Sequence, residues 1–345
     1  MKPILGILLG EATGIGPEIV AKLCAEDRLS TCCRPVLIGD IRVLNLGQKI
    51  AGVEFPVCVI DDIARARWEG PIPILDQNNL DPAIIKPGQI DSNSGRVTGD
   101  MLITAVHLCQ QGAIAGFTFA PFNKAALHYG GHHYFKDAQG LFARYLKWNG
   151  PYGEINVVQN LWTSRVTSHI PLKDVSAYLS VEKVMDAIKL VHDTLSRAGF
   201  IQPRIAVAAL NPHGGEDGLC GREEIDIIAP AVKAAQEAGI NAMGPFPADT
   251  LFIKAFEGAY DAVSTMYHDQ GQIAIKLMDF LSGVSVLAGL PYPITTPAHG
   301  TAFDIAGKGL ARINAMERAV IIAAKMAGWR DTDNKNSEDR ESHKK

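Results

Sequence analysis

The sequence predicts an α/β protein built on a largely parallel sheet that helices cover on both faces. Short apolar, strand-like runs alternate with longer helix-like segments along the chain. Parallel strands need a crossover connection, usually a helix, and a strand buried on both faces is apolar throughout. The 345 residues, of which 47% are hydrophobic and 20% charged, suit two globular domains or one large α/β unit.

The predicted strands are short, apolar and bounded by glycine, proline or polar residues. They cover residues 4–9, 34–38, 116–119, 205–210, 262–266 and 284–287, with a further strand-like run at residues 164–167. Each of these runs is followed by a segment with helical spacing or by a polar loop. The alternation therefore favours parallel pairing over hairpins.

The predicted helices lie between these strands. Residues 17–24 begin with a proline, which is favoured in the first turn of a helix. Residues 181–198 are amphipathic, and Pro230 is expected to kink or split the helix over residues 223–238. Further helices are predicted over residues 96–110 and 315–328.

Three histidines follow strand-like runs in separate loop-like motifs. They are His169, His213 and His268, with the polar neighbours Ser168, Glu216 and Asp269. Open α/β folds bind ligands at the carboxyl ends of their strands, and neutral imidazole is the commonest ligand of divalent transition metals. Spacing alone favours ordinary turn or core histidines, because it matches no local zinc motif. The shared context instead favours an open three-histidine metal site with polar supports.

Composition and charge argue against several classes of partner. The net charge of −4, with scattered basic residues, gives no electrostatic support for nucleic-acid binding. No apolar run reaches the roughly 18 residues of a membrane span, and the N-terminus has no signal-peptide pattern. The six cysteines form no CxxC motif and are expected to be reduced thiols. We therefore expect a cytoplasmic protein without nucleic-acid or membrane partners.

Two glycine-containing loops are candidate ligand sites. Residues 10–18 form a glycine-rich strand-to-helix turn that suits an anion at a helix N-terminus, or simply a tight turn. Residues 296–309 resemble the loop with which isocitrate and isopropylmalate dehydrogenases hold the adenosine end of NAD(P). In this loop His299 can stack on adenine or hydrogen-bond to it, while Gly300 and Gly307 allow a close approach of the backbone.

Several motifs occur in an order that is specific to one family. They lie at residues 14–18, 123–126, 211–213, 244–250, 267–271 and 299–302. Together they resemble the 4-hydroxythreonine-4-phosphate dehydrogenase (PdxA) family, and the resemblance covers residues 4–328. It implies an isopropylmalate-dehydrogenase-like α/β/α fold, with two subdomains around a mixed, largely parallel sheet and the active site in the cleft between them.

The resemblance also divides the chain into subdomains. Residues 1–125 and 276–329 are expected to form a discontinuous nucleotide-binding subdomain, and residues 126–275 a subdomain for metal binding and dimerisation. Residues 330–345 are nearly all polar or charged, so we expect a disordered tail.

The family's chemistry implies two cofactors. One divalent metal ion (Zn, Mg, Co or Mn) is expected on His169, His213 and His268, at a site shared across a homodimer interface. NAD is expected to take the hydride from the hydroxyl-bearing carbon, and the resulting β-keto acid then loses carbon dioxide. A metal Lewis acid suits this chemistry because it lowers the pKa of the alcohol and stabilises the developing oxyanion.

The resemblance also assigns roles to individual residues. Lys276 matches a substrate-binding lysine and is expected to be catalytic, and Asp249 and Asp269 are expected to support the metal or carry protons. Helix capping is the alternative role for both aspartates. The implied cofactor-binding residues are His299, Gly300, Thr301, Ala302, Asp304 and Gly307.

The expected substrate site departs from the family pattern at four positions. A Gly-His-Thr-Glu motif is replaced by a stretch that includes Asp137 and Ala138, and a substrate asparagine by Ser285. A phosphate-binding arginine aligns with Ile294. Because an isoleucine cannot replace a bidentate Arg–phosphate contact, these changes predict weak phosphate binding unless His132, His133 or Lys136 compensates.

The leading hypothesis from the sequence is therefore an NAD- and metal-dependent oxidative decarboxylase of a non-phosphorylated hydroxy acid, such as terephthalate cis-dihydrodiol. The alternative is a 4-hydroxythreonine-4-phosphate dehydrogenase or a related four-carbon sugar-acid phosphate dehydrogenase. A catalytically inactive metal-binding paralogue and a metallohydrolase are further alternatives. The metallohydrolase would not need the loop at residues 296–309.

Overall fold

The computed structural model describes residues 1–133, 138–279 and 281–330. Its strands form one mixed 12-stranded sheet in the order β3-β4-β2-β1-β5-β12-β11-β6-β7-β10-β8-β9. The strands are β1 (Ile4–Leu8), β2 (Arg34–Gly39), β3 (Val57–Ile60), β4 (Ile72–Asp76), β5 (Gly116–Phe119), β6 (Gly153–Val158), β7 (Leu161–Arg165), β8 (Ile205–Ala208), β9 (Ala242–Phe246), β10 (Ala262–Thr265), β11 (Val284–Ala288) and β12 (Ile294–Pro297). The predicted α/β class with a largely parallel sheet is confirmed.

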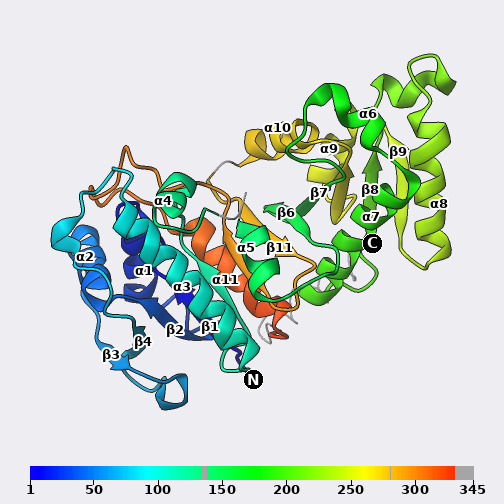
Figure 1. Ribbon diagram of the computed structural model, residues 1–345. Coiled ribbons are helices and arrows are strands. Elements are labelled where there is room, and N and C mark those ends of the chain that lie inside the picture. The colour runs from blue at the N-terminus through cyan, green and yellow to red at the C-terminus, as the bar shows by residue number, and fades with distance from the viewer. Residues whose placement is uncertain (134–137, 280, 331–345) are drawn as a thin grey trace.

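Helices cover both faces of this sheet (Figure 1). They are α1 (Gly16–Ala25), α2 (Ile41–Ala51), α3 (Ser92–Gln110), α4 (Lys124–Tyr129), α5 (Ala138–Tyr145), α6 (Val175–Tyr178), α7 (Val181–Ala198), α8 (Ala229–Glu237), α9 (Ala248–Phe256), α10 (His268–Met278) and α11 (Asn314–Met326). A π turn, Glu224–Ile228, precedes α8, and Pro230 lies in the first turn of that helix. The segment stays helical from the π turn into α8, so Pro230 follows a local widening of the helix and does not split it.

The strand directions reverse in the middle of the sheet. β11 is antiparallel to both β12 and β6, and β6 is antiparallel to β7, whereas all other neighbouring strands are parallel. As a result, the strands from β7 to β9 run opposite to those from β3 to β12. The β6–β7 hairpin turns at residues 159–160 and places two short, partly polar strands at the centre of the molecule.

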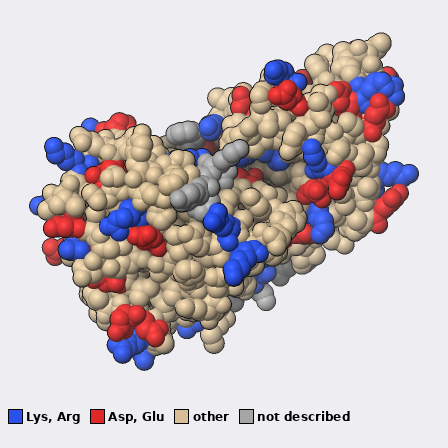
Figure 2. Space-filling view, viewed as in Figure 1, with Lys and Arg blue, Asp and Glu red and all other residues tan. Residues whose placement is uncertain are grey.

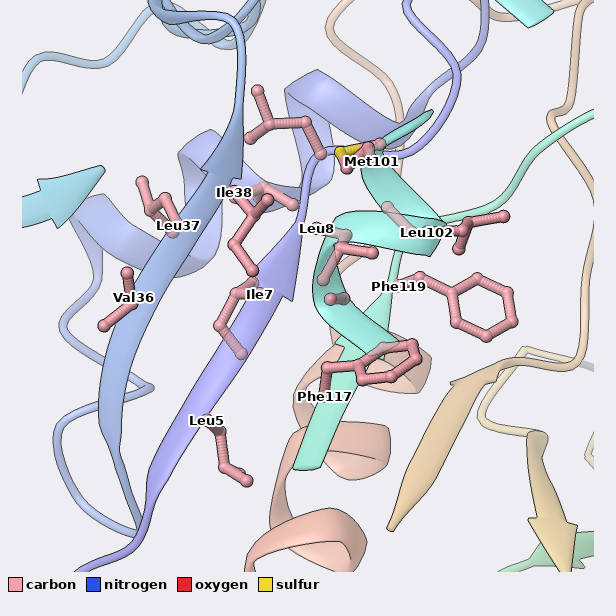
Figure 3. Packing of buried hydrophobic residues seen from close by; sticks show 14 of the residues in the cluster. Leu5, Ile7, Leu8, Val36, Leu37, Ile38, Met101, Leu102, Phe117 and Phe119 are labelled. Atoms are coloured by element: carbon pink, nitrogen blue, oxygen red, sulfur yellow. The ribbon is translucent and has the colours of Figure 1, made fainter. Parts of the chain in front are cut away.

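The first hydrophobic core lies against β1, β2 and β5. Leu5 and Ile7 of β1 and Ile38 of β2 have no exposed surface, and Phe117 of β5 is also fully buried. Figure 3 shows these side chains meeting Met101 and Leu102 of α3. This core forms the lobe on the left of Figure 1, which contains α1, α2 and α3.

A second core lies beneath α7. On the predicted apolar face of this helix, Val184, Ile188 and Leu195 have no exposed surface and pack against β6, β8 and β10, while Met185 is partly buried. Ser180 caps its first turn by accepting a hydrogen bond from the Lys183 amide, as serine commonly does at a helix start. This core belongs to the lobe on the right of Figure 1.

Helix α11 joins the two lobes. Its residues Met316, Val320 and Ala323 pack into the first core, whereas Ile322 and Met326 pack into the second. The predicted assignment of separate nucleotide-binding and metal-binding subdomains stays a prediction. The tail over residues 331–345 lies outside the described residues.

The surface carries interspersed acidic and basic side chains on the face shown in Figure 2, which agrees with the small net charge. Figure 2 also shows that the surface is hollowed between the two lobes. Among the described residues, no helix is both long and apolar enough to cross a membrane.

Candidate functional site

Two adjoining cavities lie between the lobes. The larger has a volume of about 640 Å³ and the smaller about 200 Å³. The residues that line both are Lys124, Glu154, Arg165, His169, Ser285 and Ala298. They come from the antiparallel centre of the sheet and from the loops beside it. The place where strand direction reverses is therefore also the place where the two cavities meet.

Two of the three histidines meet at the smaller cavity. His169 follows β7, and His268 begins α10 directly after β10. Because β7 and β10 are neighbouring parallel strands, their carboxyl ends bring the two rings to a centroid distance of 6.0 Å. Nδ1 of His268 lies 2.7 Å from Oδ1 of Asp269, an arrangement that leaves Nε2 for a ligand.

The third histidine does not join them within one chain. His213 lies in the turn Pro212–Gly218 after β8, at a positive φ of 55°, and its side chain is 68% exposed. Its Nδ1 is 2.7 Å from Oε1 of Glu216, and it lines neither cavity. In the described part of a single chain, no three His, Cys, Asp or Glu side chains are arranged to hold a metal ion.

Only some of the predicted substrate residues line the two cavities. Lys276 lines the smaller cavity, Ala138 the larger, and Ser285 both. Asp137 lies outside the described residues. Ile294 has no exposed surface and lines neither cavity. Its strand β12 is paired with β5 in the middle of the sheet, so its side chain belongs to the core and not to the expected substrate site.

The two predicted acidic residues also differ in position. Asp269 is exposed and contacts His268, which fits a residue that orients this ring. Asp249 lies in the first turn of α9, is exposed, and lines neither cavity. Helix α9 therefore places Asp249 away from both cavities of its own chain.

The loop predicted to bind the nucleotide, residues 296–309, is called the nucleotide loop here and borders the larger cavity. His299 and Gly300 line it, and Nδ1 of His299 is 3.1 Å from the carbonyl oxygen of its neighbour. Thr301 is nearly buried and packs against Gly14, where a Cβ would come within 3.0 Å of the threonine side chain. The Ile15 amide donates to the Thr301 carbonyl at 3.2 Å. The glycine-rich loop therefore packs against the nucleotide loop and donates a backbone hydrogen bond to it.

The rest of the nucleotide loop is held at its far end. Ala302, Asp304 and Gly307 line neither cavity, and Gly307 has a positive φ of 79°. Lys22 of α1 donates from Nζ to the carbonyl oxygens of Gly309 and Ala311, at 2.9 and 2.8 Å. The first helix therefore anchors the loop through its backbone.

The glycine-rich loop also contains a buried carboxyl. Glu11 has no exposed surface, and it accepts a 2.9 Å hydrogen bond from the Thr13 hydroxyl and one from the Asn123 amide. Burial outweighs these hydrogen bonds and raises the pKa of Glu11 to about 7. This carboxyl ties the end of β1 to the start of α4.

Sequence reasoning missed a polar cluster on the antiparallel strands. Glu154 and Asn156 of β6 lie near Arg165 of β7 and Ser285 of β11, and three of the four line both cavities, while Asn156 lines the smaller one. No motif marks these residues, because isolated polar residues in short strands have no characteristic spacing. The available signal was period-2 alternation, since Glu154 and Asn156 share one face of their strand.

Comparisons with known proteins identify the family of the chain. The family model described as "Pyridoxal phosphate biosynthetic protein PdxA" matches residues 31–323. A 4-hydroxythreonine-4-phosphate dehydrogenase of Geobacter metallireducens is 41% identical, over 94% of this chain and 96% of the relative. A D-threonate 4-phosphate dehydrogenase of Pectobacterium atrosepticum is 39% identical, over 95% and 100%.

Among solved structures, a 4-hydroxythreonine-4-phosphate dehydrogenase is more similar to this chain than a dihydrodiol dehydrogenase. The crystal structure of a 4-hydroxythreonine-4-phosphate dehydrogenase from Burkholderia phymatum is 37% identical with a TM-score of 0.81, covering 94% of this chain and 98% of the other. A terephthalate 1,2-cis-dihydrodiol dehydrogenase from Burkholderia xenovorans is 25% identical with a TM-score of 0.65, covering 93% and 98%.

These findings correct the leading hypothesis from the sequence. The expectation of a non-phosphorylated substrate such as terephthalate cis-dihydrodiol is wrong, because the more similar relatives are named for phosphorylated substrates. Ile294, on which that expectation depended, has an apolar side chain that lies in the core and lines neither cavity. The chain belongs to the PdxA family and is an oxidoreductase that acts on CH–OH groups.

Proposed function

We propose that the protein is an NAD- and divalent-metal-dependent dehydrogenase of a phosphorylated four-carbon hydroxy acid. The candidates are 4-hydroxythreonine 4-phosphate and D-threonate 4-phosphate, the substrates for which its relatives are named. The observation that carries the proposal is the smaller cavity, which brings His169 and His268 beside Lys276 in a space of about 200 Å³. A cavity of this size suits a compact polar substrate.

The histidines fit a metal ion only in part within one chain. His169 and His268 supply two imidazoles 6.0 Å apart, whereas a catalytic zinc site generally has three protein ligands and an open position. Nδ1 of His213 pairs with Glu216, so its Nε2 remains available to a ligand outside its own chain. His213 of a second copy would complete the set, and we therefore propose a homodimer with shared metal sites.

Exposed apolar side chains near the histidines support this dimer. Ile273 and Leu277 of α10 are 59% and 83% exposed, and Ile253 of α9 is 60% exposed. Both helices pack on the same core, which includes Leu251 and Ile275. Large exposed apolar side chains on such a surface are typical of a protein interface. Since α10 begins at His268, an interface along this helix would bring the partner close to the smaller cavity.

The larger cavity is the proposed site for NAD. His299 and Gly300 form part of its wall, and the backbone contacts of Thr301 and Lys22 hold their loop in place. When bound, the metal would supply a Lewis acid for the substrate hydroxyl, and NAD would supply the hydride acceptor.

The chain's own residues would position the substrate between these two groups. Lys124 and Lys276 place ammonium groups at the smaller cavity, where they can bind the substrate's anionic ends. Asp269 keeps the ring of His268 in one orientation through Nδ1. Removal of carbon dioxide after oxidation stays a prediction from the family resemblance.

A substrate panel tests the proposed function. Purified enzyme with NAD and Zn²⁺, Mg²⁺, Co²⁺ or Mn²⁺ is offered 4-hydroxythreonine 4-phosphate, D-threonate 4-phosphate and their unphosphorylated forms, and NADH absorbance is followed. We expect turnover of at least one phosphorylated acid and a much lower kcat/KM for its unphosphorylated form. Absence of NADH with both phosphorylated acids under every metal would overturn the proposal.

A further inference from the structure

The polar cluster of Glu154, Asn156, Arg165 and Ser285 contains a carboxylate with one satisfied oxygen and one open oxygen. Oε1 of Glu154 accepts hydrogen bonds from Nδ2 of Asn156 at 2.8 Å and from Oγ of Ser285 at 3.1 Å. The same Oε1 is 3.5 Å from Nη2 of Arg165. Oε2 of Glu154 accepts no hydrogen bond from the described residues. This oxygen is also not fully buried, so it is accessible to a ligand.

The arginine of this cluster is firmly held. Its side chain is 8% exposed, and it donates from Nε to the Ser168 hydroxyl at 3.0 Å and from Nη1 to Oδ1 of Asn156 at 2.7 Å. Gln272 of α10 also donates to Oδ1 of Asn156. These bonds fix the plane of the guanidinium, so the carboxylate that pairs with it is held in one position as well.

The sheet explains why the cluster faces the cavities. Ser285 is paired with Asn156 across β11 and β6, and Asn156 with Thr163 across β6 and β7. Residues two apart share a face of a strand, so Glu154 and Arg165 lie on the face of these pairs. That face forms a wall of both cavities.

The carboxylate is charged while it is in this position. Burial opposes the ionisation of Glu154, but the Arg165 guanidinium and the hydrogen bonds from Asn156 and Ser285 outweigh it. The pKa of this carboxyl therefore lies below its usual value. A half-buried, ionised carboxylate with an open oxygen prefers a cationic donor over a neutral one.

We propose that Oε2 of Glu154 binds the ammonium group next to the substrate's carboxylate, so that the enzyme prefers a phosphorylated hydroxy amino acid to the matching aldonic acid. The two candidate substrates differ at this carbon, which bears an ammonium group in 4-hydroxythreonine 4-phosphate and a hydroxyl in D-threonate 4-phosphate. The carbon is adjacent to the one that is oxidised. Glu154 lines the same small cavity as His169 and His268, which would hold the reacting hydroxyl.

This inference rests on the proposed function and names its substrate class. Arg165 acts as a positioning residue, because it holds Glu154 and leaves Oε2 to the substrate. Lys124 and Lys276 stay available for the anionic ends. A purely structural ion pair between Glu154 and Arg165 would have no preference between the two substrates, so the preference is the property to measure.

The test compares kcat/KM for the two substrates in the wild-type holoenzyme and in Glu154→Gln. The wild type is expected to prefer the ammonium substrate. Because a charged hydrogen bond contributes more than a neutral one, Glu154→Gln should lower kcat/KM for the ammonium substrate by about tenfold or more. It should lower kcat/KM for the hydroxyl substrate less, so the ratio falls.

Three controls and a check of stability separate substrate recognition from loss of structure. Glu237→Gln removes an exposed carboxylate outside both cavities and should leave the ratio unchanged. The kcat/KM for a substrate with hydrogen at the same carbon, 3,4-dihydroxybutanoate 4-phosphate, should change little in Glu154→Gln. Glu154→Asp keeps the charge and should retain part of the preference. Thermal unfolding of each variant checks that the fold persists.

The outcomes distinguish the two proposals. If neither phosphorylated acid yields NADH with the wild type, the proposed function fails. If one or both are oxidised but the wild type prefers the hydroxyl substrate, the inference about Glu154 is overturned while the function stands. An equal loss for both substrates in Glu154→Gln would also overturn it, because it would assign the residue a structural role.

Discussion

The imidazole rings of His169 and His268 lie 6.0 Å apart at the ends of two neighbouring parallel strands. The third histidine of the proposed metal set, His213, lies on an exposed turn after β8. In the proposed homodimer, one chain would contribute His169 and His268 as a pair, and the other chain would contribute His213. Several properties of the enzyme follow from that separation and from the loops around it.

Loss of any one histidine should remove the metal and the activity but not the fold. His213→Ala is expected to abolish turnover and lower metal content, because two imidazoles bind a divalent ion weakly. Elemental analysis of dialysed protein and its thermal unfolding measure both effects. His192→Ala on α7, whose ring contacts Asp193, serves as the control. Full metal content in His213→Ala would contradict the assignment.

Mixing two inactive variants tests whether the site is shared. In a mixed dimer of His213→Ala and His268→Ala, one site has all three histidines and the other has one. At equal amounts with free exchange, half of the dimers are mixed, so about one quarter of wild-type activity should return. Activity that stays at zero after exchange, verified by mass spectrometry, would show that each site is built from one chain.

The anchor of the nucleotide loop should affect NAD more than the acid substrate. Lys22 pairs with Glu18 at 2.8 Å and holds the carbonyls of Gly309 and Ala311. Lys22→Met leaves Glu18 buried without its partner, which should lower the free energy of unfolding by about 3 kcal/mol. The KM for NAD should rise while the KM for the acid changes little. Lys49→Met, at an exposed position of α2, should change neither.

Gly300 offers a test of the cofactor site without a change in stability. A Cβ at this position would have no atom within 4 Å in the protein. Gly300→Ala should therefore leave the unfolding temperature unchanged, yet raise the KM for NAD if the dinucleotide backbone lies against this residue. Isothermal titration with NAD measures the same effect directly. Unchanged NAD affinity would show that the cofactor does not lie against Gly300.

The buried Glu11 should make stability depend on pH. Its pKa is about 7 in the folded protein because of burial, against 4.5 for the unfolded chain. Folding therefore favours the protonated form of Glu11. The contribution of this group to the free energy of unfolding is fully present below pH 4.5 and is lost as the pH rises through about 7. The change amounts to roughly 3 kcal/mol. Urea unfolding gives the free energy of unfolding at each pH. This free energy should change less between pH 4.5 and 7 in Glu11→Gln than in Glu26→Gln, whose side chain is exposed.

Local sequence patterns predicted much of the fold but not its centre. The parallel strands β1, β2, β5, β8 and β10 and the antiparallel strand β11 were recognisable as apolar runs. The buried face of α7 was recognisable from its periodicity. The hairpin of β6 and β7 was not, because it is partly polar and its pairing depends on β11, more than a hundred residues away. Long-range antiparallel pairing leaves no local pattern.

The site was predictable where a residue follows a strand and not where packing decides its direction. His169 and His268 were identified because each follows a strand-like run, and the structure shows that the two strands are neighbours. Ile294 was assigned to the pocket from its position in the chain, but side-chain direction depends on strand pairing, and its pairing sends it into the core. Glu154 was missed because its partners come from three different strands.

One consequence of the sheet concerns how the enzyme closes over its substrate. Both lobes are built on a single hydrogen-bonded sheet, and α11 is buried in both cores. A rigid-body rotation of one lobe about a loop would break this ladder at β11 or β6, so we expect the lobes to move only by a small twist. Capture of the substrate then falls to short segments at the cavity rim. Amide hydrogen exchange across β6 and β11 should be slow with and without ligands, in contrast to hinge-bending dehydrogenases.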